Sequence, residues 1–223
     1  MDFDFTEEQR LLKESLDRLI ADRYGFDQRK SYAQNPEGWS RALWRQLAEL
    51  GLLGLPFAER FGGSDGGPVE TMIVMEGLGQ ALALEPYLAT IVLGGGFLRH
   101  GGSEAQQAAL LPRIAAGELT LAFATTERHS RYDLADVAAT ARRHGSGWIL
   151  DGEKGVVLHG DSADRLIVTA PIGGGQRERD GIALFLIDAA AEGVARRGYP
   201  TQDGLRAAEV TLFSVAPRET IGN

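Results

Sequence analysis

The chain has 223 residues, of which 43% are hydrophobic and 24% charged, enough for one large or two small domains with a real core. Its formal net charge of −8 makes nucleic acid and anionic membrane surfaces poor partners, because both require a positive field. The absence of cysteine excludes disulfides, thiolate catalysis and cysteine-ligated zinc, and it fits a reducing cytoplasm.

The N-terminal five residues are acidic and include no basic stretch, so a signal peptide is not expected. The best apolar run, residues 87–98, is shorter than the roughly 18 residues that a membrane helix needs. We therefore expect a cytoplasmic protein that does not engage a membrane.

Residues 1–118 carry helical patterns. Thr6 and Gln9 form a capping box ahead of an apolar stripe at Leu12, Leu16, Leu19 and Ile20. Further helices are predicted over residues 40–50, 69–82, 86–99 and 103–117. Three consecutive glycines, residues 94–96, weaken the fourth of the five helices. They indicate either tight packing on a neighbour, which we favour, or close approach of a ligand.

After Glu118 the pattern changes to short β-rich runs, at residues 119–126, 137–142, 148–150, 156–158, 166–170, 182–187 and 210–213. Asp151-Gly152 and Gly173-Gly174-Gly175 are predicted turns, the latter an exposed hairpin loop. Helices followed by strands predict an α+β chain with two segregated domains. We expect an all-α domain over residues 1–118 and an antiparallel β-barrel over residues 119–223, with a sandwich as the alternative shape.

The sequence contains no strong catalytic motif. It has no P-loop, no G-x-S-x-G and no H-E-x-x-H. Its 4 histidines lie far apart in sequence, so no metal site is expected.

Four motifs, taken in order, resemble those of the acyl-CoA dehydrogenase family. The first is Gly51-Leu52-Leu53-Gly54 with Phe61-Gly62-Gly63, and the second runs from Gly102 through Leu111-Pro112 to Gly117-Glu118. The third is Phe123-Ala124-Thr125-Thr126-Glu127, and the fourth is Trp148-Ile149-Leu150-Asp151-Gly152-Glu153-Lys154. The spacing from Phe123 to Val156, 156 − 123 = 33 positions, is that of the family without a gap. The resemblance therefore covers nearly the whole chain.

The resemblance implies FAD as the cofactor and oxidation of an acyl-CoA at its α and β carbons. In that family a carboxylate removes the α proton and hydride leaves the β carbon for the flavin. By position, the residues that would line the flavin are Phe123, Thr125, Thr126, Val156, Val157 and Leu158. The Thr126 hydroxyl would bond the pyrimidine side of the ring, or it is an ordinary cross-strand threonine.

The chain departs from the family pattern at several of these positions. Val156-Val157-Leu158 stands where the family has Trp-Ile-Thr, so Leu158 cannot donate a hydrogen bond to the flavin. Arg131 and Tyr132 stand where the family has a glycine and a serine near the substrate, and they are the candidate substrate-binding residues. Arg128 and Arg131 would bind a phosphate or a distal carboxylate, or would form an intersubunit salt bridge.

In the family, a C-terminal helical domain supplies the catalytic base and most of the subunit interface. These residues contain no counterpart, so we name no catalytic residue and expect a larger acyl-CoA dehydrogenase subunit or self-association. The predicted function is FAD-dependent α,β-desaturation of an acyl-CoA, including dicarboxylyl thioesters such as pimeloyl-CoA, with an electron-transfer flavoprotein as a partner. The alternatives are a structural partner subunit that has lost flavin binding and a simple ligand-binding module.

Overall fold

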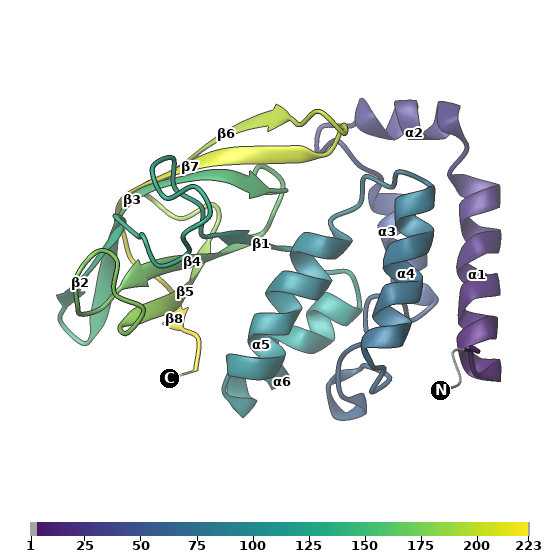
Figure 1. Cartoon of the computed structure of the whole chain (residues 1–223), viewed down its shortest axis with the longest axis horizontal. Helices are drawn as coiled ribbons and strands as arrows, with labels where there is room; N and C mark the ends of the chain where they lie inside the picture. Colours follow the sequence, from purple (N-terminus) through teal and green to yellow (C-terminus); the bar gives the residue numbers. More distant parts are fainter. Residues whose placement is uncertain (1–3, 223) are drawn as a thin grey trace.

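The computed structural model describes residues 4–222 and places the helices in the first half of the chain and the strands in the second (Figure 1). Met1, Asp2 and Phe3, part of the acidic N-terminal stretch considered as a leader, lie outside the described residues. Within residues 4–222, the structure has no helix of the length and apolarity needed to cross a bilayer. The expectation of helices followed by strands is confirmed.

Six α-helices, one 3₁₀ turn and one π-helix make up the helical part of the described chain. In chain order they are α1 (Glu7–Arg23), α2 (Phe26–Ala33), α3 (Arg41–Glu49), η1 (Glu59–Phe61), α4 (Pro68–Gln80), the π-helix η2 (Leu88–Gly95), α5 (Gly96–Gly101) and α6 (Glu104–Ala115). The capping boxes at Thr6 with Gln9 and at Ser103 with Gln106 are both formed. The sequence did not indicate α2, because none of its residues is buried and it therefore has no apolar stripe.

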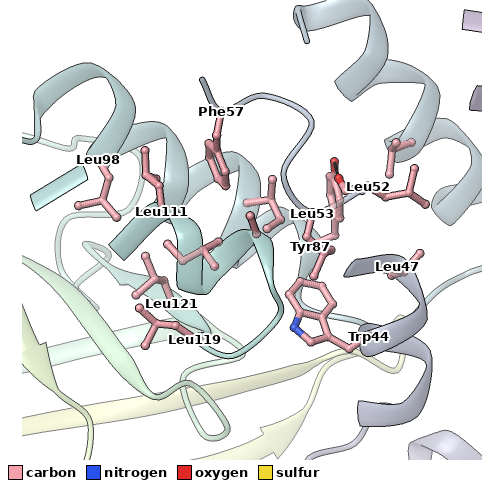
Figure 2. Close-up of a cluster of buried hydrophobic side chains, with 14 of the residues drawn as sticks. Trp44, Leu47, Leu52, Leu53, Phe57, Tyr87, Leu98, Leu111, Leu119 and Leu121 are labelled. Carbon is pink, nitrogen blue, oxygen red and sulfur yellow. Dashed lines mark hydrogen bonds between the residues drawn. The ribbon is translucent and has the colours of Figure 1, made fainter. Parts of the chain in front are cut away.

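One apolar core holds these helices together (Figure 2). Trp44 and Leu47 from α3 meet Leu52, Leu53 and Phe57 from the following segment. The core then continues through α6 to Leu119 and Leu121, at the start of the sheet region (Figure 2). The helical part is therefore packed directly onto the first strand.

The run of glycines lies at the junction of η2 and α5. A Cβ added at Gly94 would come within 2.6 Å of the Leu121 side chain, and one at Gly95 within 2.5 Å of the Phe57 ring. The favoured interpretation, tight packing on a neighbour, is confirmed, and the neighbours are a strand and a core phenylalanine.

The strands form two four-stranded sheets. One has the order β1 (Leu121–Ala124), β4 (Arg165–Pro171), β5 (Ile182–Asp188) and β8 (Glu219–Thr220). The other has the order β2 (Thr140–His144), β3 (Gly147–Leu158), β7 (Arg206–Val215) and β6 (Val194–Pro200). The predicted β-sheet domain after the helices is confirmed, but its sheets do not close into a barrel, because no ladder joins them within residues 4–222, so the alternative shape, a sandwich, describes them better. The pairing is antiparallel except between β1 and β4, which are parallel.

Burial explains why the first sheet stays open. Leu121, Ile167 and Leu186 belong to the helical core, whereas their neighbours Leu166 and Phe185 belong to the core between the sheets. Alternate side chains thus fill two cores, with helices on one face and the second sheet on the other. The result is three layers: helices, sheet, sheet.

Two strand predictions also change. Asp151-Gly152 is not a turn but lies inside the continuous strand β3, where Gly152 has φ 150°. A Cβ at Gly152 would come within 2.7 Å of Ala139, so glycine lets the strand pass this neighbour. The sequence did not indicate β6 because most of its residues are exposed and charged or small.

Candidate functional site

The end of β1 is positioned by the π-helix and α5. The Thr90 hydroxyl bonds both the Leu121 N–H and the Leu121 carbonyl at 3.1 Å, which fixes β1 against η2. Two residues further along, the Phe123 ring packs on Phe97 with ring centroids 4.4 Å apart. Phe123 is therefore half-buried between the sheet and α5.

The two segments singled out by their spacing meet in space. The Gly155 N–H donates to the Thr126 carbonyl at 2.8 Å, which joins the residues after β1 to the middle of β3. β3 shifts register against β7 between Lys154 and Val157, and this bulge gives Val156 a φ of 51°. Val156 is 56% exposed, and Thr126 is half-buried with a hydroxyl that has no hydrogen-bond partner among the described residues.

The remaining two residues of the β3 segment point elsewhere. Val157 is buried in the core between the sheets. Leu158 is half-buried and, with Tyr87 and Leu88, lines an interdomain cavity of about 220 Å³. The segment thus presents Val156 to solvent, Val157 to the sheet core and Leu158 to an apolar cavity.

The candidate substrate residues lie on an exposed loop. Arg131 has φ 49° and is exposed, and Tyr132 is 98% exposed. Within residues 4–222, neither Arg131 nor Tyr132 forms a hydrogen bond with Thr126 or Val156. Arg128 instead bonds Glu209 within the same chain at 2.7 Å, so its partner in the described structure is an intrachain carboxylate.

A buried ion pair lies next to the two segments, between the residue after Thr126 and the residue before Gly155. Lys154 Nζ donates to Glu127 Oε1 at 2.6 Å and to Thr169 Oγ1 at 3.0 Å, and the Lys154 side chain is fully buried. Glu127 also accepts the Ala138 and Ala139 N–H groups at 2.9 and 3.1 Å. Burial lowers the pKa of Lys154 below its ordinary value, and the Glu127 carboxylate opposes that shift.

Sequence reasoning included Glu127 and Lys154 only as motif letters and missed their pairing. The available signal was the alternation of inward-facing and outward-facing side chains along a strand. Leu150 and Lys154 share one face of β3, so a lysine on the inward face needs a buried partner.

These residues fit one edge and one face of a flavin. Thr126 provides a hydroxyl with no partner within residues 4–222, and the exposed Val156 side chain provides an apolar contact. The strained φ of Val156 is typical of functional positions, where an unfavourable backbone conformation is retained. Leu158 contributes no hydrogen-bond donor, so on this segment only the backbone can offer one.

Comparison with known proteins agrees with this arrangement. Residues 6–118 match the N-terminal domain of the acyl-CoA dehydrogenases and residues 122–215 match their middle domain. The acyl-CoA dehydrogenase FadE12 of Mycobacterium tuberculosis is 32% identical over 192 residues, which are 84% of this chain and 48% of FadE12. The chain thus spans about half the length of the curated relatives that it matches.

Two solved structures resemble nearly the whole chain. The ChsE4-ChsE5 complex from Mycobacterium tuberculosis has a TM-score of 0.84 at 27% identity, covering 97% of this chain and 56% of the compared one. The FAD complex of PigA has a TM-score of 0.87 at 25% identity, covering 100% of this chain and 60% of PigA. The chain belongs to the acyl-CoA dehydrogenase family, and it carries the helical N-terminal domain and the β-sheet middle domain of that family.

Proposed function

We propose that this chain is part of an FAD-dependent acyl-CoA dehydrogenase that desaturates an acyl-CoA thioester between its α and β carbons. The observation that carries the proposal is the Gly155–Thr126 hydrogen bond, which joins the two flavin segments implied by the resemblance. The FAD complex of the similar PigA supports the choice of cofactor. The domain boundary that we propose lies between residues 118 and 119, and we propose a cytoplasmic location.

Each part of this surface has a role in the proposal. Phe123, Thr125, Thr126 and Val156 contact the flavin, and Thr126 donates to its pyrimidine edge. Val157 anchors the segment in the sheet core, and Leu158 anchors it at the apolar cavity that it lines with Tyr87 and Leu88. When bound, FAD would supply the hydride acceptor. No residue is assigned as the catalytic base, because none of the site residues named here carries a carboxylate.

The substrate that we propose is a dicarboxylyl thioester such as pimeloyl-CoA, because the sequence resembles the small subunit of a bacterial pimeloyl-CoA dehydrogenase. Arg131 and Tyr132 bind the substrate in this proposal, and the guanidinium pairs with a phosphate or the distal carboxylate. Their exposure leaves both side chains accessible.

We further propose that the chain assembles with a larger acyl-CoA dehydrogenase subunit, as the ChsE4-ChsE5 complex pairs two proteins. The exposed apolar side chain of Phe213, 76% accessible, is available to such a partner. The missing donor at Leu158 favours a second candidate, a structural subunit that supports an active partner without holding flavin.

Flavin binding separates the two candidates. The purified chain is examined for visible absorbance and then titrated with FAD while flavin fluorescence is followed. A yellow protein or saturable binding supports the dehydrogenase. A folded, colourless chain that leaves free FAD unchanged, and that adds no FAD to what a co-purified dehydrogenase subunit binds by itself, supports the structural subunit.

The substrate residues are tested by calorimetric titration with pimeloyl-CoA. Arg131→Ala should weaken binding about tenfold or more if the guanidinium pairs with an anionic group. Arg128→Ala is the matched control, because that arginine is already paired with Glu209. Equal affinity of the wild-type chain and the Arg131→Ala variant would remove Arg131 from the substrate site.

A further inference from the structure

A chain of hydrogen bonds runs from the buried ion pair to the candidate flavin surface. Lys154 Nζ donates to Thr169 Oγ1 at 3.0 Å, and Thr169 Oγ1 lies 3.4 Å from Thr125 Oγ1. Lys154 and Thr169 are 1% and 5% exposed, whereas Thr125 is half-buried where β1 ends. This series of hydrogen bonds therefore leads from the buried ion pair to the half-buried Thr125 hydroxyl.

The Lys154 ammonium group determines which group donates in each hydrogen bond of this series. Paired with Glu127 at 2.6 Å, Lys154 has three N–H donors and no lone pair, so Thr169 Oγ1 must accept from it. The Thr169 proton then points to Thr125 Oγ1, which becomes the acceptor of the second bond. The Thr125 proton must leave in a third direction, and no group within residues 4–222 accepts it.

Successive hydrogen bonds polarise one another, and the first donor of this series is a buried cation. The terminal hydroxyl is therefore a directed donor. It lies next to Thr126, whose carbonyl holds the β3 segment through Gly155.

We propose that Thr125 donates a hydrogen bond to a carbonyl oxygen or ring nitrogen of bound FAD, and that Lys154 and Thr169 are positioning residues that orient this donor. The inference rests on the proposed flavin function and deepens it. It assigns a second hydroxyl contact beside Thr126 on a segment where Leu158 supplies none.

The test uses isosteric substitutions in the full chain and FAD as the probe, with binding followed by flavin fluorescence and by the visible absorption band. Thr125→Val should weaken FAD binding about tenfold and shift the absorption band, because one hydrogen bond is removed. Thr125→Ser keeps the hydroxyl and should bind like the wild-type chain. Thr211→Val, an exposed threonine on β7, controls for the substitution itself.

The positioning role is tested by Thr169→Val, which breaks the chain and leaves the Lys154–Glu127 pair in place. Thr169→Val should also weaken FAD binding. The affinity of the Thr125→Val/Thr169→Val double variant for FAD should be no lower than that of Thr125→Val. Additive losses, or no effect of Thr169→Val, would overturn the positioning role.

Without FAD, the urea midpoint should fall for Thr125→Val, because the buried Thr169 hydroxyl loses its acceptor, and should be unchanged for Thr125→Ser; FAD binding is therefore compared under conditions in which every variant is folded. If the wild-type chain and Thr125→Val bind FAD equally well, this inference is wrong and the proposed function still stands. A wild-type chain that does not bind FAD overturns the proposed function and this inference together.

Discussion

Val156 combines an unfavourable backbone with an exposed side chain. Its φ of 51° lies in the left-handed region, where a β-branched residue is strained, and 56% of its surface is accessible. The side chain therefore adds little to folding, while the strain costs about 1–3 kcal/mol. This combination suits a residue whose favourable contact is made with a ligand or partner.

Replacing Val156 by glycine should raise the free energy of unfolding by about 1 kcal/mol, because glycine adopts positive φ without strain. Urea denaturation measures the change. Val69→Gly is the matched control in helix α4, where glycine should instead cost about 0.5–1 kcal/mol. A Val156→Gly variant that is as destabilised as Val69→Gly would contradict the assignment of strain.

His159 couples stability to pH. Burial lowers its pKa from 6.5 to about 4, opposed by Asp161 and Asp203 and assisted by Arg206. Between these two values the unfolded chain binds a proton that the folded chain does not bind. Stability should therefore fall as the pH is lowered from 6.5 to 4, by about 3 kcal/mol in total from this residue.

The measurement is urea denaturation across that pH range for the wild-type chain and His159→Asn. Asparagine does not titrate there and tolerates the φ of 54° found at this position. The stability of the wild-type chain relative to His159→Asn should be constant above pH 6.5 and should fall by about 3 kcal/mol between pH 6.5 and pH 4. A pH-independent difference would show that His159 carries its proton equally in both states.

At the scale of elements, the junction of η2 and α5 determines where β1 begins. Gly94 and Gly95 permit contact with Leu121 and Phe57, and Thr90 completes the link by bonding Leu121. Irregular π-turns inside helices are frequent at functional sites. Here the turn orients the strand that carries Phe123 and Thr125.

Adjacent glycines in this junction should respond to alanine in opposite directions. Gly95→Ala places a Cβ within 2.5 Å of the Phe57 ring and should cost about 1–3 kcal/mol through overpacking. Gly96→Ala meets nothing within 4 Å and should stabilise the helix by about 0.5–1 kcal/mol. Thermal unfolding of both variants tests this, and equal effects would contradict the packing argument.

The whole molecule is joined by the sheet that contributes to both cores. Ile167 and Leu186 pack into the helical core, while Leu166 and Phe185 on the same strands pack between the sheets. Neither part can therefore lose its structure without exposing apolar surface of the other. The layered order therefore predicts that the helical part and the sheets unfold as one body.

We expect one cooperative unfolding transition for the full chain. In Trp148→Phe, fluorescence reports on Trp39 and Trp44 in the helical core, and its urea midpoint should equal that of far-UV circular dichroism. Ile167→Ala should lower both midpoints together and cost about 2–5 kcal/mol. Separate midpoints, or a shift in one signal only, would show that the two parts unfold independently.

The sequence alone determined what depends on local patterns. Capping residues and apolar stripes identified most helices, β-rich runs identified most strands, and motif order indicated the family. It also identified Phe123 to Thr126 and Val156 to Leu158 as a pair of segments that belong together. Each of these signals lies within a few residues or in a fixed spacing, so it can be read without the fold.

Only the tertiary structure decided what depends on contacts between distant residues. The open sheets, the continuous β3 at Gly152, and the Lys154–Glu127 pair all require knowing which residues face each other. Spacing likewise could not show that Arg128 pairs with Glu209, or that Thr125 is joined to a buried ammonium. The physical reason is that burial and long-range pairing determine sheet closure, charge compensation and hydroxyl direction, and these are properties of the packed chain.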